Sequence, residues 1–409
     1  MFLDNSLALI LGLIIIGFSF ETWLSVLNFR HSQAQPWNKE IFTLEKHQES
    51  LRYQKERFVI STFASSVSFG LVLVCLGFGL FGLLDNYLRS FTSNPILLAL
   101  AFFGVCVLIL NLVSFIINFY AIFSIEERYG FNRTTIATFI SDNLKNTLVT
   151  VVLGGTLAAL LVWLHSLLGA SFWLSAWIVI MAVILFLAAF STSLLLPLFN
   201  KLTPLDDGEL KTALVNYAKT QGYSVKRLFV MDGSKRSSKA NAFFSGIGQS
   251  RTIVLFDTLI EKLSVEEVTA VLAHEIGHDK RKHTVGLLAY TAIQMFVLTF
   301  LFGQLLQLEE VAEVLSAEPS FHIAAIAFVI LYKPLALLSS WLQNSLSRRF
   351  EFDADQFATS PYRTEPMKTA LEKMASQELV NLSPHPWYVK VHYSHPPLIE
   401  RVKALAGPR

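Results

Sequence analysis

Charged residues are scarce in this chain of 409 residues, where Asp, Glu, Lys and Arg together make up only 16%. Soluble globular domains carry about 25% charged residues, so this shortage argues against an ordinary soluble fold. The two signs nearly cancel, at a formal net charge of +2, and no basic patch indicates a nucleic-acid partner. Because 53% of the residues are hydrophobic, we expect the lipid bilayer to be a principal partner.

Cysteine is almost absent as well. Cys75 and Cys106 both stand in apolar runs, far from any CxxC spacing, which favours buried membrane thiols over a disulfide or a cysteine metal site. The apolar N-terminal run also lacks the features of a cleaved signal peptide. Asp4 is its only early charge and no A-x-A site follows, so we interpret the run as a retained first membrane helix.

Long apolar runs are what the sequence has in abundance. A helix needs about 20 apolar residues to cross a bilayer, and backbone groups in hydrocarbon must bond internally. We therefore expect a mainly α membrane protein with seven transmembrane helices. The seven runs are residues 7–27, 59–84, 96–123, 147–168, 171–197, 285–307 and 321–343.

Basic residues fall in alternate loops. The 28–58 and 124–146 loops are rich in Lys and Arg, whereas the 85–95 loop has only Arg89 and the 307–320 loop is acidic. Since basic loops stay in the cytoplasm, this pattern predicts an N-terminus outside and a cytoplasmic C-terminus.

The predicted organisation alternates membrane and polar parts. Residues 1–200 hold five membrane helices with cytoplasmic loops, and 285–343 hold helices six and seven. Two cytoplasmic catalytic parts, 201–284 and 344–409, lie between and after them. In the first, the β-rich runs RLFVM and TIVLF flank NAFFSG and predict a short sheet. Ser264 then begins a helix, with Glu267 three residues on as a capping box.

That helix contains LAHEIGHDK, residues 272–280. His274 and His278 are four residues apart, so both imidazoles project from one face and can share one metal ion. Glu275 lies beside them, placed to activate a water molecule for attack. The alternative is an ordinary surface helix with two histidines. We expect one zinc ion per chain, because HExxH is typical of zinc peptidases.

A third ligand is needed, since catalytic zinc usually has three protein ligands. A metzincin would have a further His, but Arg281 and Thr284 occupy that motif's positions and His283 is off register. If the HExxH helix continues into the sixth span, His278 lies about 9 Å from the bilayer edge. Glu351, carried beyond the seventh span, lies about 12 Å out and becomes the predicted ligand. A solvated helix acid is the alternative reading of Glu351.

Several segments resemble the type I CAAX prenyl endopeptidases over residues 125 to the C-terminus. The resemblance implies seven tilted helices enclosing a water-filled chamber, with a gluzincin-type α/β domain and zinc at the cytoplasmic end. It further implies that His274, His278 and Glu351 bind zinc, that Glu275 is the catalytic base, and that Asn241 and His395 contact the substrate. The matching segments are HEIGH, SRRFEFDADQFA (347–358), NAFFSG (241–246), HYSHPPLIERV (392–402), IEERYGFNRTT (125–135) and PLFNKLTPL (197–205).

Four further residues have candidate roles. Asp355 is one helical turn after Glu351 and can hold a ligand His by its second nitrogen or pass a proton onward. Asn241 begins a strand that can bind a peptide by strand addition, unless it is an ordinary sheet strand. His395, in a Ser-His-Pro-Pro turn, is an oxyanion candidate or a structural His. Arg401 pairs with Asp355 or lies on the surface.

Two charged residues, Glu21 and Lys333, lie inside predicted membrane helices. Such residues are costly in lipid and usually face partners or water, so they favour a polar interior. The alternative is snorkelling to a membrane edge.

The leading hypothesis is a membrane-integrated zinc endopeptidase, which the resemblance directs to the C-terminus of prenylated CAAX proteins. An HtpX-like quality-control protease is an alternative with the same site but fewer membrane helices. A transporter or receptor with a vestigial metal site is an alternative of another class. We expect a monomer that acts on a peptide or protein substrate, with or without an attached lipid. We further expect a prokaryotic inner-membrane protein; a eukaryotic one would lie in the endoplasmic reticulum.

Overall fold

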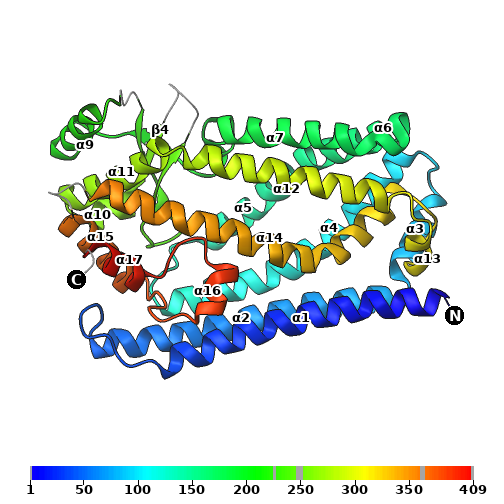
Figure 1. The fold of residues 1–409 in the computed structure, drawn as a ribbon, viewed down its shortest axis with the longest axis horizontal. Helices are drawn as coiled ribbons and strands as arrows, with labels where there is room; N and C mark the ends of the chain where they lie inside the picture. The colour runs from blue at the N-terminus through cyan, green and yellow to red at the C-terminus, as the bar shows by residue number, and fades with distance from the viewer. Residues whose placement is uncertain (1, 224–226, 246–251, 360–363, 407–409) are drawn as a thin grey trace.

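The computed structural model describes the chain except residues 1, 224–226, 246–251, 360–363 and 407–409. Long helices run parallel to its long axis, and the polar α/β part gathers at one end (Figure 1). Helix α1 (Phe2–Ala34) begins at the opposite end from helix α17 (Leu398–Leu405). The described chain therefore begins on one side of the long-helix layer and ends on the other, as an odd number of crossings requires.

Six helical segments of the described chain are long and apolar enough to cross a membrane. One of them, Ile136–Phe199, has 64 residues, far more than one crossing needs. It is broken at Gly169, where φ is +52°, a left-handed value that suits glycine. The two arms pack against each other, so counting them separately gives the seven expected crossings. The crossing helices are α1 (Phe2–Ala34), α2 (Leu44–Gly77), α4 (Pro95–Tyr120), α5 and α6 (Ile136–Val149 and Gly155–Leu168), α7 (Phe172–Leu194), α12 (His283–Leu305) and α14 (Phe321–Ala358).

The bounds of the second crossing were predicted incorrectly. We expected residues 59–84, but α2 begins at Leu44 and ends at Gly77. The chain then turns at Gly79, where φ is +61°, into a separate helix, α3 (Leu80–Arg89). The predicted 28–58 loop is therefore largely helical, and α3 joins α13 (Glu310–Val314) at the far end of the molecule (Figure 1).

Helix contacts close the crossings into a ring. The neighbours run in the order α1, α2, α4, α6, α7, α12, α14 and back to α1, with α4 also touching α14. Many large apolar side chains on the crossing helices are exposed, and Ile116, Leu148 and Ile293 are each at least 64% exposed. Exposed apolar surface on this scale suits lipid contact. The closed ring supports the expected chamber, which stays a prediction.

A four-stranded sheet forms the core of the α/β part, in the order β1-β2-β4-β3. Strands β2 and β4 are parallel, while β1 and β3 pair antiparallel at the two edges. The sheet and the edge position of NAFFSG are confirmed for the described residues; Gly246 lies outside them. The short β1, which contains Pro204, was not predicted. The strands are β1 (Leu202–Pro204), β2 (Leu228–Met231), β3 (Ala242–Ser245) and β4 (Thr252–Phe256).

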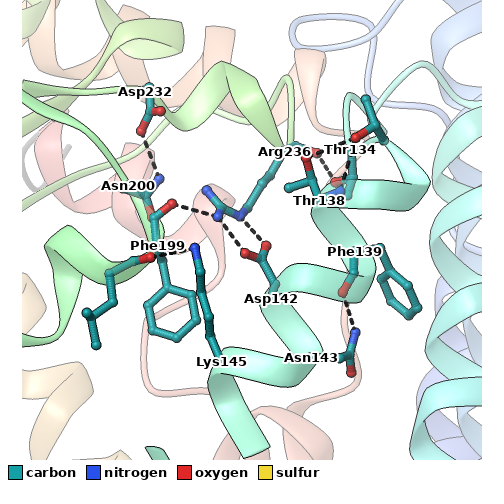
Figure 2. A network of polar contacts seen from close by, with 12 residues as sticks. Thr134, Thr138, Phe139, Asp142, Asn143, Lys145, Phe199, Asn200, Asp232 and Arg236 are labelled. Carbon is teal, nitrogen blue, oxygen red and sulfur yellow. Dashed lines mark hydrogen bonds and ion pairs between the residues drawn. The ribbon is translucent and has the colours of Figure 1, made fainter. Parts of the chain in front are cut away.

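Polar contacts fasten this sheet unit to the end of α5. Figure 2 shows Arg236 lying between Asp142 and the carbonyl of Phe199. Its Nε and Nη2 donate to the two Asp142 oxygens at 2.6 and 2.9 Å, and Nη2 also donates to the Phe199 oxygen at 2.7 Å. Beside it, Asn200 donates to Asp232 at 3.2 Å. The bidentate pair holds the α/β part in a fixed position on the membrane helices.

The two helices expected to carry the metal ligands differ in continuity. Helix α14 is continuous over 38 residues, so its last turns, with Glu351 and Asp355, project beyond the apolar part, as predicted. Helix α11 (Val265–Lys280) does not continue into α12, because Lys282 between them has φ of +58°. The continuous helix that we assumed for the sixth span is therefore wrong, and the turn changes where His283 points.

Candidate metal centre

Helix α11 is fixed at its start by the predicted capping box. The Ser264 side chain accepts a hydrogen bond from the Glu267 N–H, and the Glu267 carboxylate accepts one from the Ser264 N–H. Lys373 lies 2.7 Å from the same carboxylate. Burial raises the pKa of Glu267, but the hydrogen bonds from Lys373 and Ser264 outweigh it, so the pKa is lowered from 4.5. Helix α11 thus begins at a rigid, charged cap.

The three predicted ligands lie together. The Nε2 atoms of His274 and His278 are 3.1 Å apart. Glu351 places Oε2 3.4 Å from His274 Nε2 and Oε1 3.3 Å from His278 Nε2. One ligand atom from each residue lies within 4.8 Å of the others. The sequence-based placement of Glu351 opposite the HExxH helix agrees with this geometry.

The chemistry of this donor set fits a metal ion. Two imidazole nitrogens in close contact repel when both present lone pairs, unless a cation lies between them. The Glu351 Oε2 is buried and, within the described part of the chain, has no hydrogen-bond partner. A divalent cation would engage all three groups, and two His with one carboxylate is a donor set of catalytic zinc.

Gly277, inside the motif, permits the two helices to approach. A Cβ at this position would lie 3.2 Å from the Ala354 Cα and 3.1 Å from the Phe357 Cβ on α14. Backbone contact of this kind needs a small residue. The glycine of HEIGH therefore brings Glu351 within reach of the histidines, a role that we did not assign from the sequence.

Asp355 and Arg401 hold the second nitrogen of His274. The Asp355 Oδ1 lies 2.9 Å from His274 Nδ1, and Arg401 donates to both Asp355 oxygens at 2.8 and 2.6 Å. Burial lowers the pKa of His274, but the neighbouring carboxylates of Asp355 and Glu351 outweigh it and raise that pKa to about 9. Arg401 is 9% exposed, so the interior pairing with Asp355 is present and the surface alternative is wrong.

His283 is a residue whose position sequence reasoning did not predict. Its Nδ1 lies 3.1 Å from the Nδ1 of His278, and its ring stacks on Phe350 at 4.2 Å between centroids. The side chain is only 3% exposed. The turn at Lys282 produces this contact, because a continuous helix would have carried His283 away from His278. The sequence does show a histidine five residues after His278, but we had considered His283 only as a metal ligand.

The site opens into a cavity of about 610 Å³ that reaches from the α/β part to the membrane helices. Glu275 and Asn241 are among its polar lining residues, and Asn241, just before the edge strand, is exposed. Ala188 of α7 and Leu288 of α12 line the other side. A chain in this cavity would therefore touch both the candidate metal ligands and the membrane-spanning helices.

His395 also reaches the centre. Its Nε2 lies 3.3 Å from the Glu351 Oε1, although 64% of the side chain is exposed. The exposed part faces the cavity that His395 helps to line. An imidazole N–H that faces this cavity can donate a hydrogen bond to a bound group.

A ring of apolar helices with this centre at one end defines a membrane-embedded metallopeptidase. Comparison with known proteins then fixes the family. Residues 204–409 match the model of peptidase family M48, and residues 3–201 match the model described as CAAX prenyl protease N-terminal, five membrane helices. The chain belongs to peptidase family M48, a family of metallopeptidases, which implies a metal ion at this centre.

Individual relatives agree over the full length. The CAAX prenyl protease 1 homolog of Arabidopsis thaliana is 32% identical over 418 residues, covering 97% of both chains. CAAX prenyl protease 1 of Saccharomyces cerevisiae is 30% identical over 97% of this chain and 94% of its own length. The crystal structure of S. mikatae Ste24p matches with a TM-score of 0.93 and 28% identity, covering 98% of each chain.

Proposed function

We propose that this protein is a zinc endopeptidase that cleaves near the C-terminus of prenylated CAAX-type proteins. The observation that carries the proposal is the joint position of His274, His278 and Glu351, beside Glu275, in a cavity that also touches membrane helices. A lipidated chain needs polar catalytic groups and an apolar surface within reach of each other. The names of the matched relatives support the CAAX assignment.

His274, His278 and Glu351 are the proposed zinc ligands, with one zinc ion per chain. Zinc would polarise the peptide carbonyl and lower the pKa of water at the site. Asp355 and His283 hold the Nδ1 atoms of the two histidines, leaving each Nε2 for the ion. Arg401 positions Asp355 through two hydrogen bonds.

Glu275 is the proposed catalytic base. It accepts a proton from the attacking water and then donates it to the leaving amine. His395, which faces the cavity, donates a hydrogen bond to the negative oxygen that develops on the carbonyl. Asn241 immediately precedes β3, which lies at an edge of the sheet formed by the described residues and can bind the peptide by strand addition. Besides Glu275, Asp355 is a candidate for proton transfer, because its carboxylate lies beside the Nδ1 of His274.

We place the catalytic end in the cytoplasm, with the N-terminus outside and the protein functioning as a monomer. The orientation is supported by the concentration of Lys and Arg in the loops at the catalytic end of the fold. The membrane is the inner membrane of a prokaryotic host or the endoplasmic reticulum of a eukaryotic one. The division of the chain into residues 1–200, 201–284, 285–343 and 344–409 follows the same topology.

Both alternatives are less well supported. An HtpX-like protease shares the HExxH site, but the match over residues 3–201 to a five-helix CAAX protease model favours the prenyl protease branch. A transporter with a vestigial metal site has no need for the complete set of Glu275, three ligands and their supporting residues.

The test is cleavage of a farnesylated CAAX peptide by the purified protein in detergent. We expect release of the C-terminal tripeptide, loss of activity with a zinc chelator and recovery when zinc is restored. Cleavage of unprenylated membrane-protein segments at the same or higher kcat/KM would instead support the quality-control alternative. The absence of any peptidase activity in zinc-loaded protein would contradict the proposal.

A further inference from the structure

A second polar cavity lies among helices α1, α2, α14 and α16 (Pro386–His392), away from the metal ligands. It has a volume of about 350 Å³ and combines four titratable side chains, Glu21, Lys333, Tyr388 and His392. His392 pairs with Glu21 at 3.1 Å. Hydroxyl groups surround them, from Thr22, Ser25, Ser61, Thr62 and Ser65.

Lys333 is the unusual member. It lies in the middle of a membrane-spanning helix, with its Nζ 5.8 Å from the centre of the Phe18 ring. Among the described residues, no carboxylate forms an ion pair with it. An ammonium group within a membrane helix is costly, and such residues usually pair with another group or mark a substrate or ion pathway. Lys333 thus offers a positive charge with no anionic protein partner in the described chain.

An apolar cavity of about 550 Å³ adjoins the polar one and shares Lys333 and Ser65 with it. Its walls are large aliphatic and aromatic side chains: Ile14, Phe69, Val72, Val329 and Ile330. The two cavities together present a cation at Lys333, a carboxylate at Glu21 and an adjoining apolar surface. A ligand that fits all three has an anionic group, a cationic group and aliphatic side chains.

The polar cavity is connected with the metal centre through the chain. His392 lines the cavity and His395, three residues later, reaches Glu351. Three extended residues span about 10 Å, so the two side chains belong to neighbouring regions. Lys333 lies farther away, 18 residues before Glu351 on α14, which is about 27 Å along a helix. A ligand at Lys333 is therefore beyond the reach of a tripeptide still attached at the metal centre.

We infer that this pair of cavities binds the released C-terminal tripeptide, with its carboxylate at Lys333 and its new ammonium group at Glu21. The inference rests on the proposed function, because hydrolysis of a CAAX chain releases a short peptide with aliphatic side chains and both charges. The carboxylate replaces the missing anion beside Lys333, and the aliphatic side chains cover the apolar walls.

The test measures peptide binding to zinc-loaded Glu275→Gln protein in detergent by calorimetry. The ligands are Val-Ile-Ala with free ends, its C-terminal amide and its N-acetyl form. We expect Lys333→Met to weaken binding of the free tripeptide at least tenfold, and amidation to weaken it similarly in protein with Lys333. The amide should bind equally to both proteins. Lys145→Met, a lysine outside both cavities, should change nothing.

If Lys333→Met fails to fold, the same binding measurements are made on Glu21→Gln. It should weaken the free tripeptide but leave binding of the N-acetyl form unchanged. Equal affinity of the acid and the amide for protein with Lys333 would overturn the inference. A phospholipid that copurifies, is lost in Lys333→Met and is not displaced by the tripeptide would also overturn it. Tripeptide binding without cleavage of farnesylated peptide by the unmutated enzyme would instead contradict the proposed function.

Discussion

The Nδ1 of His283 lies 3.1 Å from the Nδ1 of His278. His278 can therefore donate its Nδ1 proton to His283 and present Nε2 to a metal ion. Outer contacts of this kind contribute about 10–100-fold to metal affinity. We expect His283→Ala to weaken zinc binding by about that factor, measured by competition with a chromogenic chelator.

Zinc affinity, compared at equal thermal stability, separates a role of His283 in positioning His278 from a role in folding. His283→Gln keeps a group that can accept the hydrogen bond and should retain more zinc affinity than His283→Ala at the same thermal stability. If both variants bind zinc as tightly as the unmutated protein, His283 does not position His278.

The capping box of α11 predicts a dependence of stability on pH. The pKa of Glu267 is lowered from 4.5 in the fold, so its ionised form stabilises the protein above pH 4.5. This contribution is lost as pH falls through 4.5 toward the folded pKa. Glu267→Gln should lower the free energy of unfolding at pH 7 by about 1 kcal/mol, as for other cap losses.

Thermal unfolding of the two proteins in detergent checks this. The difference in Tm should be largest at pH 7 and should shrink as pH falls below 4.5, because Glu267 is then protonated in the unmutated protein. Other carboxylates titrate in both proteins and do not contribute to the difference. A difference that stays constant or grows as pH falls would show that the Glu267 charge is not the source of the stabilisation.

Asn241 and His395 are expected to affect different kinetic constants. His395→Ala should reduce kcat by about 10²–10³, the effect of losing one oxyanion donor, with little change in KM. Asn241→Ala should mainly raise KM, because it acts on the bound peptide strand. Zinc content should be unchanged in both, as measured by atomic emission. Normal kinetics in both variants would exclude these substrate roles.

The orientation can be tested by thiol labelling in a protein without native cysteines, with Cys75 and Cys106 replaced by Ser. Lys219→Cys and Ser93→Cys place exposed thiols on the two ends of the fold. In intact cells, an impermeant reagent should label Ser93→Cys and leave Lys219→Cys unlabelled until the cells are opened. The opposite pattern would show that the catalytic end is outside.

The sequence was sufficient for features with a local physical origin. Seven apolar crossings follow from bilayer thickness, and the Ser264 cap follows from backbone hydrogen bonding. The height of Glu351 could be predicted because α14 is a single continuous helix, whose rise per residue gives height directly. The height of His278 was argued from a continuous sixth helix, which the turn at Lys282 interrupts.

Features set by tertiary contacts were not accessible in the same way. The turn at Lys282 has no proline or glycine to announce it, so the contact between His283 and His278 was missed. The close packing at Gly277 depends on Ala354, which is distant in sequence. The neighbouring cavities at Lys333 depend on four helices meeting, although the charge of Lys333 within a membrane span had already suggested a polar interior.

The central claim is that His274, His278 and Glu351 hold zinc while Glu275 moves the proton. The most direct measurement pairs zinc content with turnover of a farnesylated CAAX peptide for the unmutated protein, Glu275→Gln and His274→Ala. The account predicts that Glu275→Gln keeps one zinc per chain but loses at least 10²-fold in kcat, while His274→Ala loses zinc and activity together. Near-normal turnover by Glu275→Gln, or full zinc retention by His274→Ala, would contradict it.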